Sequence, residues 1–200
     1  LYQNSSIKED FDSILQILFP ITGIENVTSE KGRGYNNDST DFAQDSMFHV
    51  VETDVCANAQ FVVCDDMGNE WADHINIANN KIAFIHSKFT KKDTYGASAM
   101  HEVVAQALKN IGRVHASIKE YESNFNSKWN ENYQETQIPR TMKNGLAITL
   151  FNDIREDIEN VYLNPNSKRQ IYLATPFFSK RQMENNLNNL LTPTTNPNPH

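Results

Sequence analysis

Residues 70–88 read EWADHINIANNKIAFIHSK. Two strand-like runs, at 70–77 and 82–88, flank Ala78-Asn79-Asn80-Lys81, whose asparagines are typical of a tight turn. The stretch therefore predicts a β-hairpin. In a hairpin the start of the first strand lies beside the end of the second, so we expect Asp73 and Lys88 to meet at one edge of a sheet.

The sequence on either side of this hairpin predicts further strands and helices. Short runs rich in Phe and Val predict strands at 47–51 and 60–64. Apolar residues at helical spacing predict a helix from about residue 98, with Gly112 as its C-terminal stop. We also expect helices at 6–18, 117–133 and 179–191, a strand-helix or helical segment at 146–162, a strand at 170–177, and a long polar loop at 22–45.

This order of elements predicts an α/β fold with a short mixed sheet flanked by helices. We expect a single domain over 1–191, a motif core at 47–113, and a disordered tail or linker at 192–200. Because the chain begins at Leu1 rather than a methionine, we expect it to be a fragment of a longer polypeptide.

Composition excludes several classes of protein. The 200 residues carry 18 Lys and Arg against 25 Asp and Glu, a net charge of -7, which argues against a non-specific nucleic-acid coat protein. It does not argue against an enzyme that binds nucleic acid through a local patch and a metal ion. No signal peptide and no apolar run of about 18 residues is present, so we expect no membrane association. The two cysteines are too few for a disulfide scaffold, and we expect a cytoplasmic location.

The hairpin carries the residues best suited to chemistry. Glu70 and Asp73 precede or begin its first strand, and Lys88 ends its second. Carboxylate oxygens bind hard cations such as Mg²⁺, and a bound cation polarises a phosphate and lowers the pKa of a water molecule. An adjacent ammonium can orient that water or offset charge in the transition state. These residue types indicate phosphodiester hydrolysis.

These residues resemble a known superfamily. Glu70-x2-Asp73 followed by a strand ending in IAFIHSK resembles the PD-(D/E)XK nucleases, in which an acid on one strand is followed on the next strand by an (Asp/Glu)-x-Lys pair. Glu70 before Asp73 is similar to the resolvase-like and RecB-like branches, and Gln106 resembles the helical glutamine of RecB-like members. Residues 61–112 further resemble nuclease-like domains attached to bacterial helicase-type proteins of restriction and phage-defence systems.

The resemblance implies a restriction-endonuclease-like core and a metal-dependent endonuclease that hydrolyses DNA with Mg²⁺ or Mn²⁺. In this interpretation Glu70 and Asp73 hold the metal, Lys88 orients the nucleophilic water, and Gln106 supports the site or contacts the scissile strand. The implied partners are DNA and a helicase or ATPase domain or subunit of the same system, and a homo-oligomer is a further possibility.

One position departs from the superfamily pattern. His86 stands where the family has an acid two residues before the lysine, and histidine suits softer ions such as Mn²⁺ or Zn²⁺ better than Mg²⁺. His86 is then a ligand or base, or Glu102 on the following helix supplies the missing carboxylate, or catalysis has been lost. The last case predicts a catalytically inactive module that binds nucleic acid or a partner protein. A purely structural interaction domain is a third alternative.

Several of these residues have simpler interpretations. Glu70 and Asp73 are also what a solvated strand edge carries, His86 is compatible with a half-buried histidine, and the Asp65-Asp66-Met67-Gly68 segment is typical of a turn as well as of a metal site. Four basic side chains are candidate nucleic-acid contacts or ordinary surface charges: Lys91, Lys92, Lys109 and Arg113.

Overall fold

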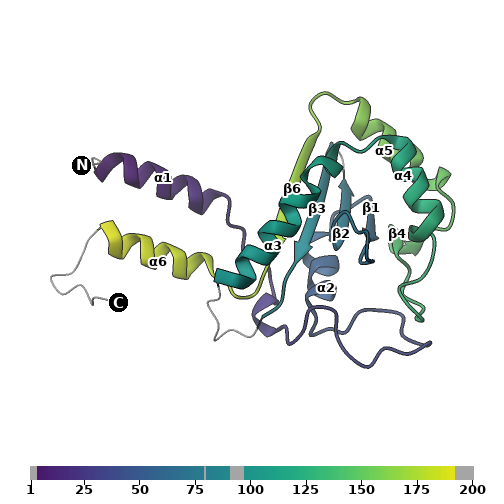
Figure 1. The fold of residues 1–200 in the computed structure, drawn as a ribbon, viewed down its shortest axis with the longest axis horizontal. Helices are drawn as coiled ribbons and strands as arrows, with labels where there is room; N and C mark the ends of the chain where they lie inside the picture. Colours follow the sequence, from purple (N-terminus) through teal and green to yellow (C-terminus); the bar gives the residue numbers. More distant parts are fainter. Residues whose placement is uncertain (1–3, 79, 91–96, 192–200) are drawn as a thin grey trace.

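The hairpin predicted from residues 70–88 lies inside a six-stranded mixed sheet. The structure, a computed structural model, describes residues 4–78, 80–90 and 97–191. Its strands follow the order β5-β4-β1-β2-β3-β6 (Figure 1), with β6 parallel to β3 and all other neighbours antiparallel. Their bounds are β1 Phe61–Cys64, β2 His74–Ala78, β3 Lys81–Ser87, β4 Thr141–Lys143, β5 Leu146–Ala147 and β6 Lys168–Ala174. The predicted α/β class with a mixed sheet flanked by helices is confirmed.

The turn of the hairpin explains its register. Ala78 pairs with Lys81 across the connection, and Asn80 has a φ of 59°, in the left-handed region that asparagine tolerates better than most residues. The first strand begins at His74 rather than near Glu70, because the residues before it form a loop tied to buried Asp65. The hairpin prediction is otherwise confirmed.

The described part of the chain contains six α-helices, of which α2, α3, α4 and α5 pack around the sheet. Helix α3 packs on β3 and β6, and it is followed by the 3-10 helix η3. Two short π-helical segments, η2 and η4, continue α2 and α4. The bounds are α1 Asn4–Gln16, η1 Ile24–Asn26, α2 Met47–Val50, η2 Val51–Val55, α3 Ala97–Asn110, η3 Ile111–His115, α4 Ile118–Asn124, η4 Phe125–Trp129, α5 Asn152–Leu163 and α6 Lys180–Leu191.

Alternation along the strands gives the sheet two apolar faces. Phe84 and Ile75 belong to a core shared with α4, η4 and α5, where Trp129 is fully buried. Ile85 and Val62 belong to a second core, shared with α2 and η2. Because successive strand residues face opposite sides, the even-numbered residues at the end of β3 lie on the first of these faces.

The strand predicted at 47–51 is wrong, because this segment is helix α2. Ser46 is the reason: its hydroxyl accepts a hydrogen bond from the backbone N–H of His49 at 3.2 Å, which caps the first turn. The apolar run is then buried as a helix, with Met47 and Phe48 fully enclosed. A short apolar run fits either structure, and only the cap distinguishes them.

The helix predicted from residue 98 is confirmed as α3, but Gly112 does not stop it. Gly112 lies within η3, and it is absent from the glycines with positive φ, so the chain tightens into a 3-10 turn instead of ending in a left-handed cap. The strands at 60–64 and 170–177, the strand and helix within 146–162, and the helices at 117–133 and 179–191 are confirmed with shifted ends.

Helices α1 and α6 lie side by side and extend away from the sheet (Figure 1). The tail or linker predicted at 192–200 lies outside the described residues. Among the helices that the structure describes, none combines the length and the apolar character that crossing a bilayer requires.

Candidate functional site

The hairpin brings Asp73 to the end of β3. His74 pairs with Ile85, so Asp73, one residue earlier, lies opposite His86. Asp73 Oδ2 accepts a hydrogen bond from the backbone N–H of Ser87 at 2.8 Å, and its side chain is almost completely buried. The acid at the start of the first strand, Asp73, therefore contacts the His86-Ser87-Lys88 segment through the backbone N–H of Ser87.

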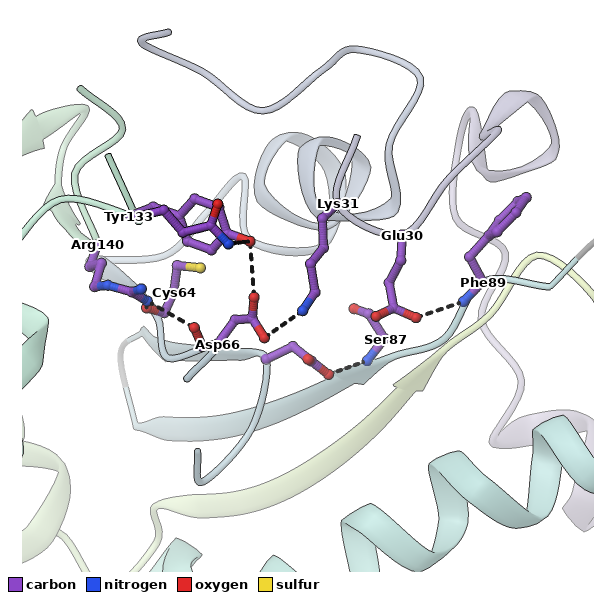
Figure 2. Close-up of polar contacts among 10 residues, drawn as sticks. Glu30, Lys31, Cys64, Asp66, Ser87, Phe89, Tyr133 and Arg140 are labelled. Carbon is purple, nitrogen blue, oxygen red and sulfur yellow. Dashed lines mark hydrogen bonds and ion pairs between the residues drawn. The ribbon is translucent and has the colours of Figure 1, made fainter. Parts of the chain in front are cut away.

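A loop supplies two further charged residues beside Asp73. Lys31 Nζ lies 2.7 Å from Asp66 Oδ1, and Glu30 Oε2 accepts a hydrogen bond from the backbone N–H of Phe89 at 3.3 Å. Figure 2 shows Lys31 reaching from the loop to Asp66, and the Glu30 carboxylate beside Ser87 and Phe89. Glu30, Lys31, Asp66 and Asp73 will be called the acidic cluster, in which Lys31 is the single cation.

Burial and neighbouring charges shift the pKa values of Asp73 and Lys31 in the acidic cluster. Burial raises the pKa of Asp73 to about 7; the charges of Glu30 and Asp66 raise it further, while the Ser87 N–H and His74 act against the rise. Burial would lower the pKa of Lys31, but its hydrogen bond to Asp66 and the charges of Asp66, Glu30 and Asp73 outweigh burial and raise that pKa. A further positive charge at this position would favour the ionised form of Asp73.

Glu70 stands apart from Asp73. It is half-buried, and no hydrogen bond or ion pair between the described residues joins it to Asp73. Burial and then the charge of Asp66 raise the pKa of Glu70, whereas Lys31 and Lys109 lower it. Glu70 therefore borders the acidic cluster. The carboxylates whose charges raise the pKa of Asp73 are those of Glu30 and Asp66.

His86 and Lys88 share the face of β3 that carries Phe84. Lys88 Nζ lies 2.5 Å from Glu102 Oε1 on α3, so the helix does bring a carboxylate to the motif lysine. His86 is buried, burial lowers its pKa to about 4, and its Nε2 has no hydrogen-bond partner among the described residues. The imidazole is therefore neutral at pH 7.

Gln106 lies one turn beyond Glu102 on α3. Its Oε1 is buried and has no hydrogen-bond partner within the described chain. An unpaired buried amide oxygen destabilises the fold. The Gln106 oxygen can therefore accept a hydrogen bond from an additional donor. The structure thus places His86 on β3, Lys88 directly after it, and Glu102 and Gln106 on α3. The Asp73 side chain instead bonds to the Ser87 backbone and is affected by the charges of Glu30 and Asp66.

Asp65 has a structural role. Its fully buried carboxylate accepts hydrogen bonds from Trp71 N at 2.7 Å and Trp129 Nε1 at 2.6 Å, and it contacts the Lys128 ammonium. These contacts connect the loop after β1 to η4. Asp65 is committed to them, which favours the turn interpretation of the 65–68 segment over a direct metal role.

The predicted basic contacts are only partly described. Lys109 and Arg113 are exposed and line a hollow of about 290 Å³ together with His115 and Glu120. Arg113 pairs with Glu120 at 3.6 Å, which reduces its availability to a phosphate. Lys91 and Lys92 lie outside the described residues.

Sequence reasoning missed Glu30 and Lys31. They lie in the loop predicted at 22–45, which has no apolar periodicity to indicate its path. Backbone hydrogen bonds from Met47 and Phe48 to the Ser29 and Glu30 carbonyls, both 3.0 Å, hold this loop against α2. The two loop glycines were the available signal in the sequence: Gly32 and Gly34 both have positive φ, 97° and 75°, and a Cβ on Gly32 would lie 2.7 Å from Ala43 Cβ, so the chain is closely packed there.

The donor chemistry of the acidic cluster suits a hard cation. Among the described residues, no three His, Cys, Asp or Glu side chains come close enough to form a metal site by themselves. Mg²⁺, however, usually binds proteins through one or two carboxylates and takes its remaining ligands from water and substrate phosphates. Asp73 and Glu30 could supply two such carboxylates, because both accept backbone hydrogen bonds at the end of β3, from Ser87 and from Phe89.

Comparisons with known proteins assign no family. No protein-family model matches the chain, and neither a curated protein nor a solved structure matches it significantly. The functional interpretation therefore depends on the residues and their geometry.

Proposed function

We propose that this chain is a metal-dependent nuclease domain that hydrolyses phosphodiester bonds in DNA. The observation that carries the proposal is the hydrogen bond from Ser87 N to Asp73 Oδ2, which puts a buried carboxylate beside the His86-Ser87-Lys88 end of β3. The six-stranded mixed sheet flanked by helices is compatible with the restriction-endonuclease-like core that the motif resemblance implies. DNA as the substrate, and a role in bacterial restriction or phage defence, follow from that resemblance. A cytoplasmic location is proposed from the two cysteines.

The residues divide the chemical work as follows. Asp73 and Glu30 would hold the Mg²⁺ or Mn²⁺ ion, with Glu70 at the border of the cluster. When bound, the cation polarises the phosphate and lowers the pKa of the attacking water. Lys31 offsets negative charge beside Asp73, and Lys88 orients the water once the substrate draws its ammonium from Glu102.

The remaining candidates act around this centre. His86 is neutral and buried, so it contributes as a hydrogen-bonding group rather than as a charge. Gln106 offers its unpaired amide oxygen to the substrate strand or to His86. Lys109 and Arg113 contact phosphates outside the scissile bond. A helicase or ATPase domain, and a second copy of this chain, are the partners that the resemblance suggests.

A second function is favoured by the ion pair of Lys88. With its ammonium bound to Glu102 at 2.5 Å, the motif lysine is neutralised, and the position of the second acid is a neutral histidine. This arrangement suits a catalytically inactive module that binds nucleic acid or a partner protein in a larger assembly. The two functions differ in one property, which is whether the site at the end of the β2–β3 hairpin cleaves DNA.

Cleavage of labelled single- and double-stranded DNA tests the proposal. Wild type is compared in Mg²⁺ and Mn²⁺ with Asp73→Asn, Lys88→Gln and the surface control Lys119→Gln. The nuclease proposal predicts metal-dependent cleavage that both site variants lose and the control keeps. Cleavage that survives both site variants would contradict it.

The inactive-module alternative has its own variant, His86→Glu. If wild type binds DNA without cutting it, a gain of metal-dependent cleavage in His86→Glu identifies a degenerate site. If wild type cuts DNA and His86→Glu loses activity, histidine is the functional residue. Thermal melting of each variant separates loss of function from loss of fold.

A further inference from the structure

A polar hollow opens at the end of the sheet where β3 and β6 begin, opposite the end of β3 that carries Lys88. Its volume is about 540 Å³. In a chain of net charge -7, its lining contains two lysines, four side-chain amides and no carboxylate. The polar lining residues are Asn58, Asn80, Lys81, Asn166, Lys168 and Gln170.

The two lysines are direct neighbours with unbalanced charge. Lys81 and Lys168 are register partners on parallel strands, so their side chains start from backbones about 4.8 Å apart and leave the sheet on the same side. Like charges placed side by side in this way are unfavourable. Neither lysine takes part in the ion pairs of the described residues, and the Lys81 ammonium lies 5.8 Å from the centroid of the uncharged Tyr172 ring. An anion between them would remove the repulsion.

The amides present donors to the hollow. Asn80 Oδ1 already accepts a hydrogen bond from Asn164, and Gln170 Oε1 accepts one from the Tyr172 hydroxyl at 2.8 Å. With the oxygens engaged, the amide NH2 groups of Asn80 and Gln170 are left as donors, and no described residue accepts from them. The hollow therefore offers two ammonium groups and at least two N–H donors.

We propose that this hollow binds a phosphate group. Lysine ammonium ions bind phosphate as point charges, and neutral amide donors complete the contacts to its oxygens. The shared chemistry allows two sources, a nucleic-acid backbone phosphate or a free phosphate ion. The site lies at the other end of β3 from Asp73 and is independent of the proposed nuclease activity.

Two-dimensional NMR of the whole chain tests the site with inorganic phosphate as the probe. Chloride at matched ionic strength is the reference, and the variants are Lys168→Gln, the Lys81→Gln/Lys168→Gln pair, and Lys119→Gln as the matched exposed control. We expect saturable shifts at the Lys81, Lys168 and Gln170 amides, at least tenfold weaker binding in the double variant, and no change in the control. The single Lys168→Gln variant, whose side chain is exposed, keeps the test valid if the double variant unfolds.

Binding of a single-stranded oligonucleotide distinguishes the two sources. If the phosphate belongs to nucleic acid, the double variant binds the oligonucleotide more weakly, and the magnitude of the slope of log affinity against log salt falls by about 1.4, since each phosphate contact on a single strand contributes about 0.7. If free phosphate is the ligand, the phosphate shifts remain while the salt slope is unchanged. The proposal is overturned if phosphate shifts do not exceed those of chloride and the oligonucleotide binds both proteins equally.

Discussion

Replacing Asp65 with alanine tests whether this acid holds the loop between β1 and β2. The Asp65 carboxylate is fully buried and accepts hydrogen bonds from the Trp71 backbone and the Trp129 indole, while Lys128 pairs with it. In Asp65→Ala the two tryptophan donors lose their acceptor inside the core, and the Lys128 ammonium keeps only the Asn69 carbonyl, at 3.2 Å. The loop they hold leads directly to Asp73, so the loss reaches the candidate site.

The expected cost can be worked out from these contacts. Removing one partner of a buried ion pair typically costs about 3–5 kcal/mol, because the other charge is left uncompensated. For a chain of this size, each kcal/mol lowers Tm by about 2–4 °C. We therefore expect Asp65→Ala to melt about 6–20 °C below wild type, measured by far-UV circular dichroism.

Two further variants sharpen this test. Asp65→Asn keeps the side-chain volume and one acceptor oxygen, so its Tm should lie between those of wild type and Asp65→Ala. The exposed Asp38→Ala should melt with wild type. A Tm of Asp65→Ala within about 2 °C of wild type would refute the structural role, since the lost contacts would then be worth less than about 1 kcal/mol.

Three other predictions follow from single contacts. Burial raises the pKa of Asp73 from 3.8 to about 7, so the folded state binds this proton more tightly than the unfolded state. The contribution of Asp73 to the free energy of unfolding is therefore fully present below about pH 4 and is lost as pH rises through about 7. Between these values the free energy of unfolding falls by up to about 1.4 kcal/mol per pH unit. Urea unfolding should show this slope in wild type and not in Asp73→Asn; equal slopes would contradict it. Glu102→Gln should lower Tm by no more than about 4 °C, since its pair with Lys88 is largely exposed, and a larger fall in a thermal melt would count against this. Ser46→Ala should cost about 1 kcal/mol in chemical unfolding because the His49 N–H loses its cap, and an unchanged midpoint would mean that the cap is dispensable.

Local patterns sufficed for the central hairpin, and they failed where a short segment fits more than one structure. The turn asparagines and the alternation of 70–88 specify the β2–β3 pair, which the structure reproduces in register. The run at 47–51 carries no periodicity long enough to choose between strand and helix, and the cap at Ser46 decides it. Gly112 is the opposite case, where a residue that usually ends a helix continues it as η3.

The candidate site was predictable only for residues on regular elements. Asp73 could be placed beside the His86-Ser87-Lys88 segment because hairpin geometry relates the start of one strand to the end of the next. Glu30 and Lys31 could not, because their positions depend on hydrogen bonds between a non-periodic loop and α2. Glu70 was expected next to Asp73 on a strand, and it lies instead in the loop that Asp65 holds.

The ion pair between Lys88 and Glu102 does not by itself decide between an active and an inactive site. Glu102 is more than half exposed, and exposed pairs contribute about 0–1 kcal/mol. Hydrogen bonds that involve charged groups, such as ammonium with phosphate, contribute about 1.5–3 kcal/mol. The Glu102 carboxylate therefore does not lock the Lys88 ammonium in place, and under the proposed nuclease function a substrate phosphate would compete with Glu102 for it.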